Sequence, residues 1–171
     1  MHKYCRLALD SIEYYLQHND YLETPKGLPD GAYKKRAGVF TSLHLKNDHS
    51  LRGCIGTFAP TKENIAEEII YNAVMAALED PRFAPVALGE LKNLEVSVDV
   101  LQAPEDCKKE DLDPRKYGVI VTKDKRKGLL LPDLPGIDDV EQQITIASGK
   151  GGIDYPREDF RIQRFMVERY I

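Results

Sequence analysis

The sequence predicts an α+β fold with a mixed, mostly antiparallel sheet and about three principal helices. Segments with helical and with strand-like patterns follow one another in an irregular order, and two strand-like segments are joined by a short polar turn. A doubly wound fold would instead alternate strands and helices regularly. The chain has 171 residues, of which 42% are hydrophobic, and this suits a single globular domain over residues 1–171.

The first half of the chain supplies a helix and a hairpin. Apolar residues recur at helical spacing over 3–16, which predicts the first helix. Residues 23–33 are rich in proline and glycine and are expected to form an irregular loop. Strands are predicted over 38–45 and 51–58, with the polar sequence KNDHS as the turn between them.

A second helix is predicted over 62–79, with Thr61 as its N-cap and the sequence Asp80-Pro81 as its end. Residues 94–101 alternate between apolar and polar side chains and predict a half-buried strand. Residues 105–114 are charged and are expected to be a solvent-exposed connector.

The last third of the chain continues the mixed pattern. We predict two short strands over 117–122 and 128–131. A helix over 139–150 follows, and Asp138 and Glu141 form its predicted capping box. A closing strand is predicted over 160–171.

Composition and charge exclude several classes of protein. The formal net charge is −4, which argues against a general nucleic-acid binder because such domains usually carry a basic face. The three cysteines, Cys5, Cys54 and Cys107, show no paired spacing, and this favours a reducing compartment. A signal-peptide core and a membrane-spanning apolar run are both absent. We therefore expect a cytoplasmic protein that does not bind a membrane.

The segment LRGCIGTF, Leu51 to Phe58, is the main candidate for a site. Glycine is costly inside a strand and usually marks a bulge or a close approach by a backbone or a ligand, and here Gly53 and Gly56 flank Cys54. One interpretation makes Cys54 a nucleophile, with Arg52 on the same strand face and backbone amides beside an anion. The other makes Cys54 a small buried side chain, and this interpretation is slightly favoured.

The length of the hairpin turn decides which side chains face Cys54. A two-residue turn places Leu43 opposite Cys54 and turns His44 to the other face, whereas a three-residue turn places Ser42 opposite Cys54. The first register is preferred, so a Cys–His pair is not expected from this hairpin.

The segment DPRF, Asp80 to Phe83, is a second candidate. Arg82 either binds a carboxylate or phosphate with two parallel hydrogen bonds, or pairs with an acid of the protein such as Glu90. The spacing of zinc-site motifs and of the phosphate-binding P-loop is missing. No metal or cofactor is therefore expected.

Several segments together resemble the AMMECR family, in particular its stand-alone microbial form, AmmeMemoRadiSam system protein A. The resemblance covers most of the chain in order and rests on these segments: GVF, LRGCIGTF, DPRF, ELKNLEVSVDVL, YGVIVTKDKRKGLLLPDLPG, GKGGI and RFMVERY. It implies two unequal lobes around a cleft and a pathway shared with a Memo-like protein and a radical-SAM protein. It implies no particular reaction. The lysine of GKGG, Lys150, is retained as a site residue because the family pattern has a lysine there.

Two functions of different class remain open, and the sequence does not decide whether the protein is an enzyme. The first is binding of a small anionic ligand or a partner in a cleft built around LRGCIGTF and DPRF. Its ligand-binding residues would be Arg52, Gly53, Gly56, Arg82 and Lys150. The alternative is a small cysteine-dependent enzyme that uses Cys54 as its catalytic residue, with Arg52 and Arg82.

Overall fold

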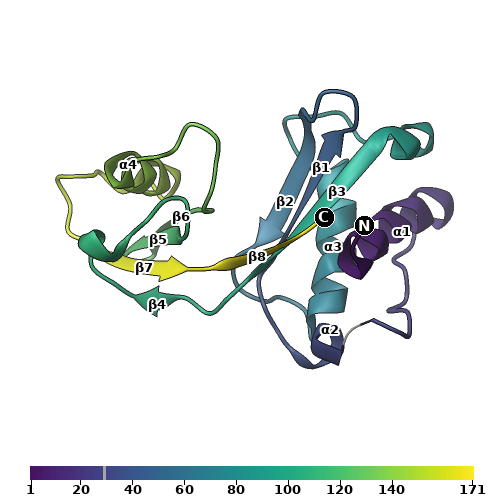
Figure 1. The fold of residues 1–171 in the computed structure, drawn as a ribbon, viewed down its shortest axis with the longest axis horizontal. Helices are drawn as coiled ribbons and strands as arrows, with labels where there is room; N and C mark the ends of the chain where they lie inside the picture. The colour runs from purple at the N-terminus through teal and green to yellow at the C-terminus, as the bar shows by residue number, and fades with distance from the viewer. Residues whose placement is uncertain (29) are drawn as a thin grey trace. The chain divides into compact units, whose positions relative to one another are not determined.

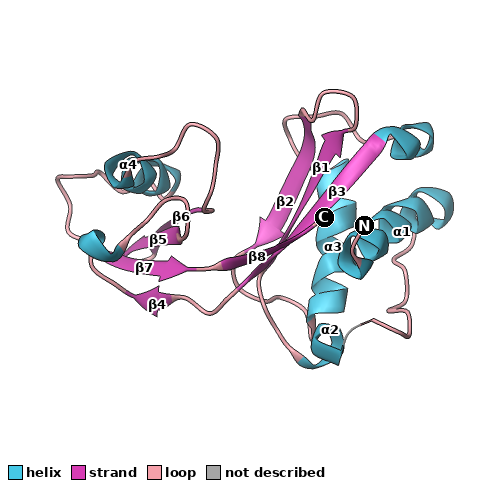
Figure 2. Cartoon of the chain, viewed as in Figure 1, coloured by secondary structure: helices cyan, strands magenta, loops and turns pink. Residues whose placement is uncertain are grey.

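Two four-stranded sheets organise the protein in the computed structural model, which describes residues 1–28 and 30–171. Figures 1 and 2 show the elements, which in chain order are α1 (Lys3–His18), α2 (Asp30–Lys34), β1 (Val39–Leu45), β2 (Leu51–Thr57), α3 (Ile65–Leu78), the 3-10 helix η1 (Leu88–Asn93), β3 (Leu94–Leu101), β4 (Glu105–Asp106), the 3-10 helix η2 (Lys109–Asp111), β5 (Gly118–Lys123), β6 (Arg126–Leu130), α4 (Val140–Lys150), β7 (Arg161–Phe165) and β8 (Val167–Tyr170).

The chain divides into two compact units. Residues 1–100 with 168–171 form the first, and residues 101–167 form the second. The sheet of the first unit has the strand order β2-β1-β3-β8, and the sheet of the second has the order β4-β7-β5-β6. The α+β class, the antiparallel pairing and the three principal helices are confirmed. The strands build two sheets, whereas the sequence predicted one. The assignment of residues 1–171 to a single domain stays a prediction.

In the first unit, α3 packs on β1 and β2, and α1 packs on α3. Strand side chains alternate between the two faces of a sheet, so Val39, Thr41 and Leu43 of β1 are buried toward α3. The side chains between them, including Ser42 and His44, belong to the opposite face. The core of this unit is therefore built between one sheet face and two helices.

Helix α1 agrees with its prediction to within two residues at its C-terminal end. The His2 side chain accepts a hydrogen bond from the backbone of Tyr4, and Asn19 ends the helix in the left-handed conformation. The apolar stripe of α1 is buried.

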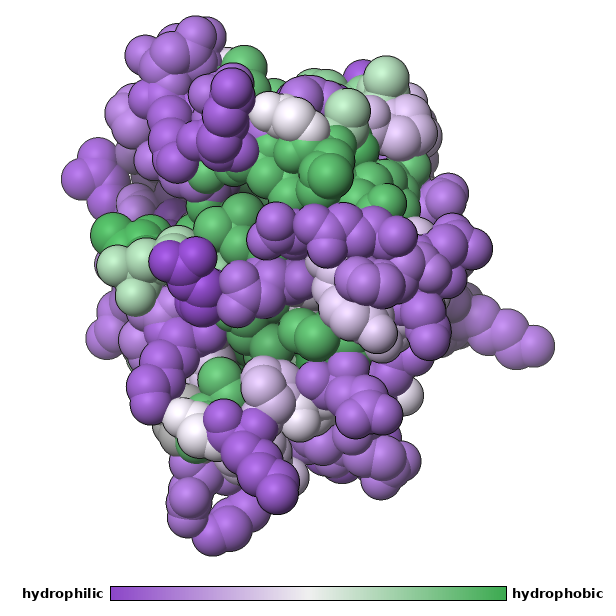
Figure 3. Space-filling view, turned by 90° about the vertical axis from the view of Figure 1, so that its right-hand side faces the viewer, coloured by the Kyte–Doolittle hydropathy of each residue, from purple (hydrophilic) through white to green (hydrophobic). Residues whose placement is uncertain are grey.

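Figure 3 views the molecule from the side of α1, where hydrophilic side chains cover most of the surface and an apolar area is visible between them. None of the helices over 1–28 and 30–171 combines the length and apolarity that a bilayer crossing requires.

Helix α3 begins three residues later than predicted because Asn64, and not Thr61, is its N-cap. Thr61 instead donates two hydrogen bonds to Glu68, one from its backbone N–H and one from its hydroxyl. Glu68 also accepts from the Thr57 hydroxyl at 2.6 Å and from the Lys62 backbone at 2.8 Å. The Glu68 side chain is fully buried, so these four donors replace water around its carboxylate.

The preferred register of the β1–β2 hairpin is wrong. Ser42 lies opposite Cys54, as the three-residue turn required, and Leu43 lies opposite Gly53. The register then shifts, so that His44 lies opposite Leu51 and Arg52 is the extra residue of the irregularity. Ser42, and not Leu43, therefore shares a face with Cys54.

In the second unit, α4 packs on β5 and β6. A Cβ atom on Gly128 would lie 1.7 Å from the backbone oxygen of Ala147, so glycine is required where β6 meets the helix. The predicted capping box is wrong, because Asp139 is the N-cap and Asp138 pairs with Arg115 instead.

Three further segments differ from the sequence predictions. The closing segment is two strands, β7 and β8, which belong to different sheets. The predicted loop over 23–33 contains the start of α2, and Pro29 of this loop lies outside the described residues. The predicted connector over 105–114 contains β4 and η2.

Glu68 gives a prediction for stability. Burial alone would raise the pKa of its carboxyl, but the hydrogen bonds outweigh burial and hold that pKa below its ordinary value. The replacement Glu68→Gln should lower the free energy of unfolding by about 2–4 kcal/mol at neutral pH, because an amide cannot accept from all four donors. Since the folded-state pKa is the lower one, this contribution is present above about pH 5 and is lost as the pH falls through the folded pKa.

Urea unfolding of both proteins from pH 7 down to pH 3 measures this difference. The difference in the free energy of unfolding between wild type and Glu68→Gln should become smaller as the pH approaches 3. The exposed neighbour Glu63 provides the control Glu63→Gln, which should unfold as wild type does. Equal effects of the two replacements would contradict the prediction.

Candidate functional site

The backbone of Cys54 is held by two side chains from the segment that follows α3. Strand β2 is an edge strand, so the N–H and C=O of Cys54 that point away from β1 need partners from outside the sheet. Asp80 accepts the Cys54 N–H at 2.8 Å, and Arg82 donates to the Cys54 carbonyl at 3.4 Å. The DPRF segment thereby binds LRGCIGTF along the open edge of the strand.

Asp80 and Arg82 also bind each other. The guanidinium donates through Nε at 2.9 Å and through Nη2 at 2.7 Å to the two carboxylate oxygens. These hydrogen bonds are the main reason that the pKa of Asp80 lies far below its ordinary value, although the side chain is 3% exposed. Arg82 stays 54% exposed. Among the described residues, no hydrogen bond uses its Nη1.

Arg52 is committed to a carboxylate of the protein. It donates to Glu90 of η1 through Nε at 3.1 Å and Nη2 at 3.3 Å, and to the backbone oxygen of Ala84 at 2.9 Å. The backbone N–H of Ala87 and then Arg52 lower the pKa of Glu90. Arg52 is 14% exposed, so its guanidinium holds η1 against β2 and has little surface left for a ligand.

Both motif glycines are explained by close packing. A Cβ atom on Gly53 would lie 2.2 Å from the backbone oxygen of Ala76 in α3, and one on Gly56 would lie 2.2 Å from Cγ of Phe40. Neither glycine has a positive φ. The close approach that the sequence indicated is therefore confirmed, and the approaching atoms belong to the protein itself.

The Cys54 thiol lies on the polar face of the sheet. Its sulfur is 3.2 Å from the Ser42 hydroxyl, and Ser97 of β3 is the partner of Ser42 on the other side. Burial raises the pKa of the Cys54 thiol, and the Ser42 hydrogen bond and the charge of Arg82 oppose this only in part. The thiol is therefore mostly protonated at neutral pH, which is unfavourable for a nucleophile.

The rest of this face carries charged pairs. Asp99, which is 2% exposed, binds Arg169 of β8 at 2.8 Å and 3.0 Å. Glu95, in the same strand, pairs with His49 of the hairpin turn. The alternating side chains of β3, Glu95, Ser97 and Asp99, thus continue the polar face next to Ser42.

The structure brings five of the six predicted site residues together. Arg52, Gly53, Cys54 and Gly56 are in β2, and Arg82 binds the same strand. Lys150 belongs to the second unit, where it is exposed at the C-terminal end of α4. Over residues 1–28 and 30–171, no group of three or more His, Cys, Asp or Glu side chains is placed to hold a metal ion.

Sequence reasoning missed two contributors to the site. Asp80 was interpreted only as the end of a helix, yet an aspartate often accepts the backbone N–H two residues on, as it does here from Arg82 at 3.1 Å. This Asx-turn pattern could have identified Asp80 as a fixed carboxylate beside Arg82. Ser42 was placed opposite Cys54 only in the register that was not preferred. Glu90 was named as a possible acid for Arg82, but it binds Arg52, and Arg82 binds Asp80 instead.

A comparison with family models covers nearly the whole chain. The model of the AMMECR1 family matches residues 5–170. The chain belongs to the AMMECR1 family. The match includes both units and all the residues of the site. A crystal structure of the uncharacterized protein PH0010 from Pyrococcus horikoshii is similar, with a TM-score of 0.88 and 34% identity, and the similarity covers 97% of this chain and 88% of that one.

Two further relatives are closer in sequence than PH0010. A protein of Thermotoga maritima is 50% identical over 170 residues, which are 99% of this chain and 97% of that protein. A protein of Clostridium acetobutylicum, CA_C1420, is 48% identical over 168 residues. These residues are 98% of this chain but only 35% of the Clostridium protein. An AMMECR1-like segment can thus be part of a much longer polypeptide.

The glycine contacts predict an order of stability. Gly53→Val should be the most damaging, because the carbonyl of Ala76 is helix backbone and cannot turn away. Gly56→Val should cost at least about 1–3 kcal/mol, because the added Cβ would lie 2.2 Å from Cγ and 2.6 Å from Cα of Phe40, and Cys54→Ala should cost less than either. Thermal melts of the three variants measure the order. Gly89→Val is the control, because no atom lies within 4 Å of the added Cβ. A melting temperature of Gly53→Val equal to that of wild type would refute the packing explanation.

Asp80 gives a second prediction. Asp80→Asn should lower the free energy of unfolding by about 1–3 kcal/mol at neutral pH, because an amide has one oxygen for the four hydrogen bonds that Asp80 accepts, while solvent screens the half-exposed Arg82. The pKa of Asp80 is lowered in the folded state, so its contribution is complete above the unfolded-state pKa and is lost as the pH falls toward the folded value. Denaturant unfolding at pH 7 and pH 3 tests this, with the exposed Asp159→Asn as the control. If the difference in the free energy of unfolding between wild type and Asp80→Asn were the same at both pH values, the stabilising role of the ionised Asp80 carboxylate would be contradicted.

Proposed function

We propose that this AMMECR1-family protein is a binding module, and that its polar sheet face around Cys54 holds a small anionic group of a ligand or partner. The observation that carries the proposal is the exposed edge of Arg82. Its Nε and Nη2 bind Asp80, while the side chain stays 54% exposed beside Cys54. The Cys54 thiol, whose sulfur accepts the proton of the Ser42 hydroxyl, adds one weaker donor on the same side.

Charge limits the kind of anion. The Asp80–Arg82 pair has no net charge, and Arg52 is neutralised by Glu90. A multiply charged anion would gain little here, whereas a carboxylate or a singly charged phosphate ester can bind through hydrogen bonds to an arginine. The proposed ligand group is therefore a single carboxylate or phosphate. Gly56 and Gly53 contribute by packing, and Lys150 stays a predicted ligand residue.

A partner protein is the second part of the proposal. The Clostridium relative, in which the matched segment is 35% of the chain, supports a function together with another polypeptide. By family resemblance, the partners proposed are a Memo-like protein and a radical-SAM protein. The cysteine-dependent enzyme is less well supported, because burial raises the pKa of Cys54 and no hydrogen bond among the described residues joins its sulfur to a histidine.

Titration with acetate and with inorganic phosphate, followed by NMR, tests the anion site. The Nε–H resonance of Arg82 and the amide of Cys54 should shift with saturation. Ser42→Ala should weaken binding about threefold to tenfold, because it removes the hydroxyl that orients the Cys54 thiol. It leaves the Asp80–Arg82 pair in place. The control Arg157→Gln removes an 82% exposed arginine of the second unit and should change nothing. If neither ion shifts the Arg82 resonance, the anion site does not exist.

The pH dependence of the rate of thiol alkylation distinguishes the binding-module hypothesis from the enzyme hypothesis. Because burial raises the pKa of Cys54, iodoacetamide should modify Cys54 at pH 7 more slowly in the folded protein than after unfolding in urea. The rate should rise only well above neutral pH. Mass spectrometry distinguishes Cys54 from the buried Cys5 and from Cys107. Rapid modification of Cys54 alone at pH 7 would instead favour the enzyme.

A further inference from the structure

The open edge of strand β2 offers a further pair of polar groups beside the proposed anion site. β2 is an outer strand of its sheet (Figure 1), and the residues of an antiparallel strand direct their N–H and C=O groups alternately toward one side and the other. Cys54 directs both groups away from β1, toward Asp80 and Arg82. Gly56, two residues further on, therefore directs its N–H and C=O toward the same open edge.

These two backbone groups of Gly56 have no protein partner in the part of the chain that the structure describes, residues 1–28 and 30–171. Gly56 is partly exposed, and β2 ends at the next residue, Thr57. A backbone N–H and C=O at a sheet edge are strong hydrogen-bonding groups that another chain or a ligand can bind. The unpaired edge thus has the length of one residue and offers one donor and one acceptor.

Arg82 lies next to the Gly56 N–H along this edge. Its Nη2 donates to the Cys54 carbonyl at 3.4 Å, and only Ile55 separates that carbonyl from the Gly56 N–H in the chain. Among the described residues, the hydrogen bonds of the Arg82 guanidinium use Nε and Nη2 and leave Nη1 open. The edge therefore presents, in order, a cationic donor, a backbone donor and a backbone acceptor.

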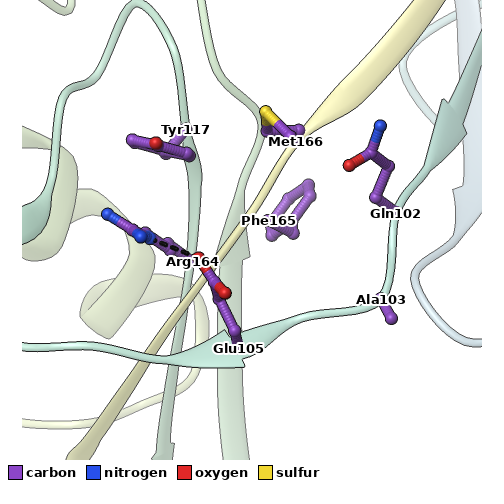
Figure 4. A pocket seen from close by; sticks show the side chains of 7 residues that line it. All are labelled: Gln102, Ala103, Glu105, Tyr117, Arg164, Phe165 and Met166. Carbon is purple, nitrogen blue, oxygen red and sulfur yellow. Dashed lines mark hydrogen bonds and ion pairs between the residues drawn. The ribbon is translucent and has the colours of Figure 1, made fainter.

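The arginine of a small pocket in the second unit provides a contrast. Figure 4 shows Arg164 with the side chains around that pocket. Its guanidinium donates to Glu105 at 2.7 Å and to the backbone oxygen of Asp111 at 2.9 Å, and it lies 4.4 Å from the centroid of the Tyr117 ring. The protein thus covers most of Arg164, which is 26% exposed, whereas Arg82 is 54% exposed.

One residue of an antiparallel neighbour satisfies both groups of Gly56. In an antiparallel hydrogen-bonded pair, the two opposed residues exchange two hydrogen bonds, from N–H to C=O in both directions. The neighbour runs opposite to β2, so its carboxyl end points from Gly56 toward Cys54 and Arg82. A neighbour that ends at this residue directs its terminal carboxylate toward the Arg82 guanidinium and its N–H toward the Gly56 carbonyl.

We infer, on the basis of the anion site proposed above, that the ligand group is an N-acylated α-amino acid with a free carboxylate. The carboxylate accepts hydrogen bonds from Arg82 and from the Gly56 N–H. The amide N–H of the same ligand residue donates to the Gly56 carbonyl. This chemical group occurs at the C-terminus of a polypeptide and in free acylamino acids. A simple phosphate monoester does not supply the N–H donor.

Four carboxylates, each titrated and followed by NMR, test this ligand chemistry. N-acetylglycine carries the carboxylate and the N–H, acetoxyacetate replaces the N–H by an ester oxygen, and acetate is the anion alone. N-acetylglycine should bind about threefold to tenfold more tightly than acetoxyacetate, which corresponds to one hydrogen bond. Acetyl-Ala-Ser-Ala-Gly distinguishes the two sources. Tighter binding than that of N-acetylglycine assigns the group to a polypeptide C-terminus, and equal or weaker binding assigns it to a free acylamino acid.

Amide hydrogen exchange locates the ligand at the edge of β2. In the free protein, the Gly56 amide should exchange faster than the Cys54 amide, which donates to Asp80. N-acetylglycine at about ten times its dissociation constant should slow the exchange of Gly56 about tenfold. The exchange of Cys54 should change less, because its N–H already has a partner.

The variant Arg82→Lys examines the two parts of the site separately, with Arg157→Lys in the second unit as its control. Arg82→Lys should weaken the binding of all four carboxylates, because lysine lacks the planar set of donors. It should leave the ratio of the affinities for N-acetylglycine and acetoxyacetate unchanged, because the ligand N–H binds Gly56. The titrations and the exchange rates of the wild-type protein test the inference even if Arg82→Lys fails to fold.

Two results would overturn this assignment of the ligand. They are equal affinity for N-acetylglycine and acetoxyacetate, and an exchange rate of Gly56 that N-acetylglycine does not change. The anion site would survive both if acetate still shifts the Nε–H resonance of Arg82. If no carboxylate shifts that resonance, the anion site itself is wrong.

Discussion

The buried carboxylate of Asp80 is the interaction on which the candidate site depends. A buried charge is tolerated only with a full set of partners, and Asp80 obtains them from the Cys54 N–H, the Arg82 N–H and the Arg82 guanidinium. Because these donors come from two separate segments, LRGCIGTF and DPRF form one structural unit. The position of the Arg82 guanidinium is consequently fixed by the same carboxylate that fixes the strand. Any ligand that binds the open side of Arg82 meets a donor that is already oriented.

The motif LRGCIGTF also explains how a strand can carry two glycines and a charged residue. Its consecutive residues serve different neighbours: Arg52 reaches Glu90 of η1, Gly53 admits the backbone of α3, and Cys54 turns to the polar face. Each position is restricted by an atom of the protein, so the unusual composition does not by itself indicate catalysis. The Cys54 thiol does not by itself indicate catalysis either, because the burial that packs it also raises its pKa.

The sequence predicted the long elements well because their periodicity is strong, as in α1 and β3. It named Glu90 as a possible acid for Arg82, whereas Glu90 binds Arg52 and Asp80 binds Arg82, because the fold decides which carboxylate each arginine meets. The hairpin register was wrong because turn length alone does not reveal the irregularity at Arg52. Asp80 was missed because its role in ending α3 already accounted for it. The sequence does not indicate that the closing segment divides at Met166, because a strand-like pattern continues through both β7 and β8.

The two-residue strand β4 has a consequence for the behaviour of the protein in concentrated solution. An edge strand offers unpaired backbone groups to other molecules, and short length, charge and a nearby proline discourage such pairing. β4 has all three, because Glu105 and Asp106 are both exposed and Pro104 precedes them. The edge of this sheet is thus poorly suited to recruit a strand from a second molecule.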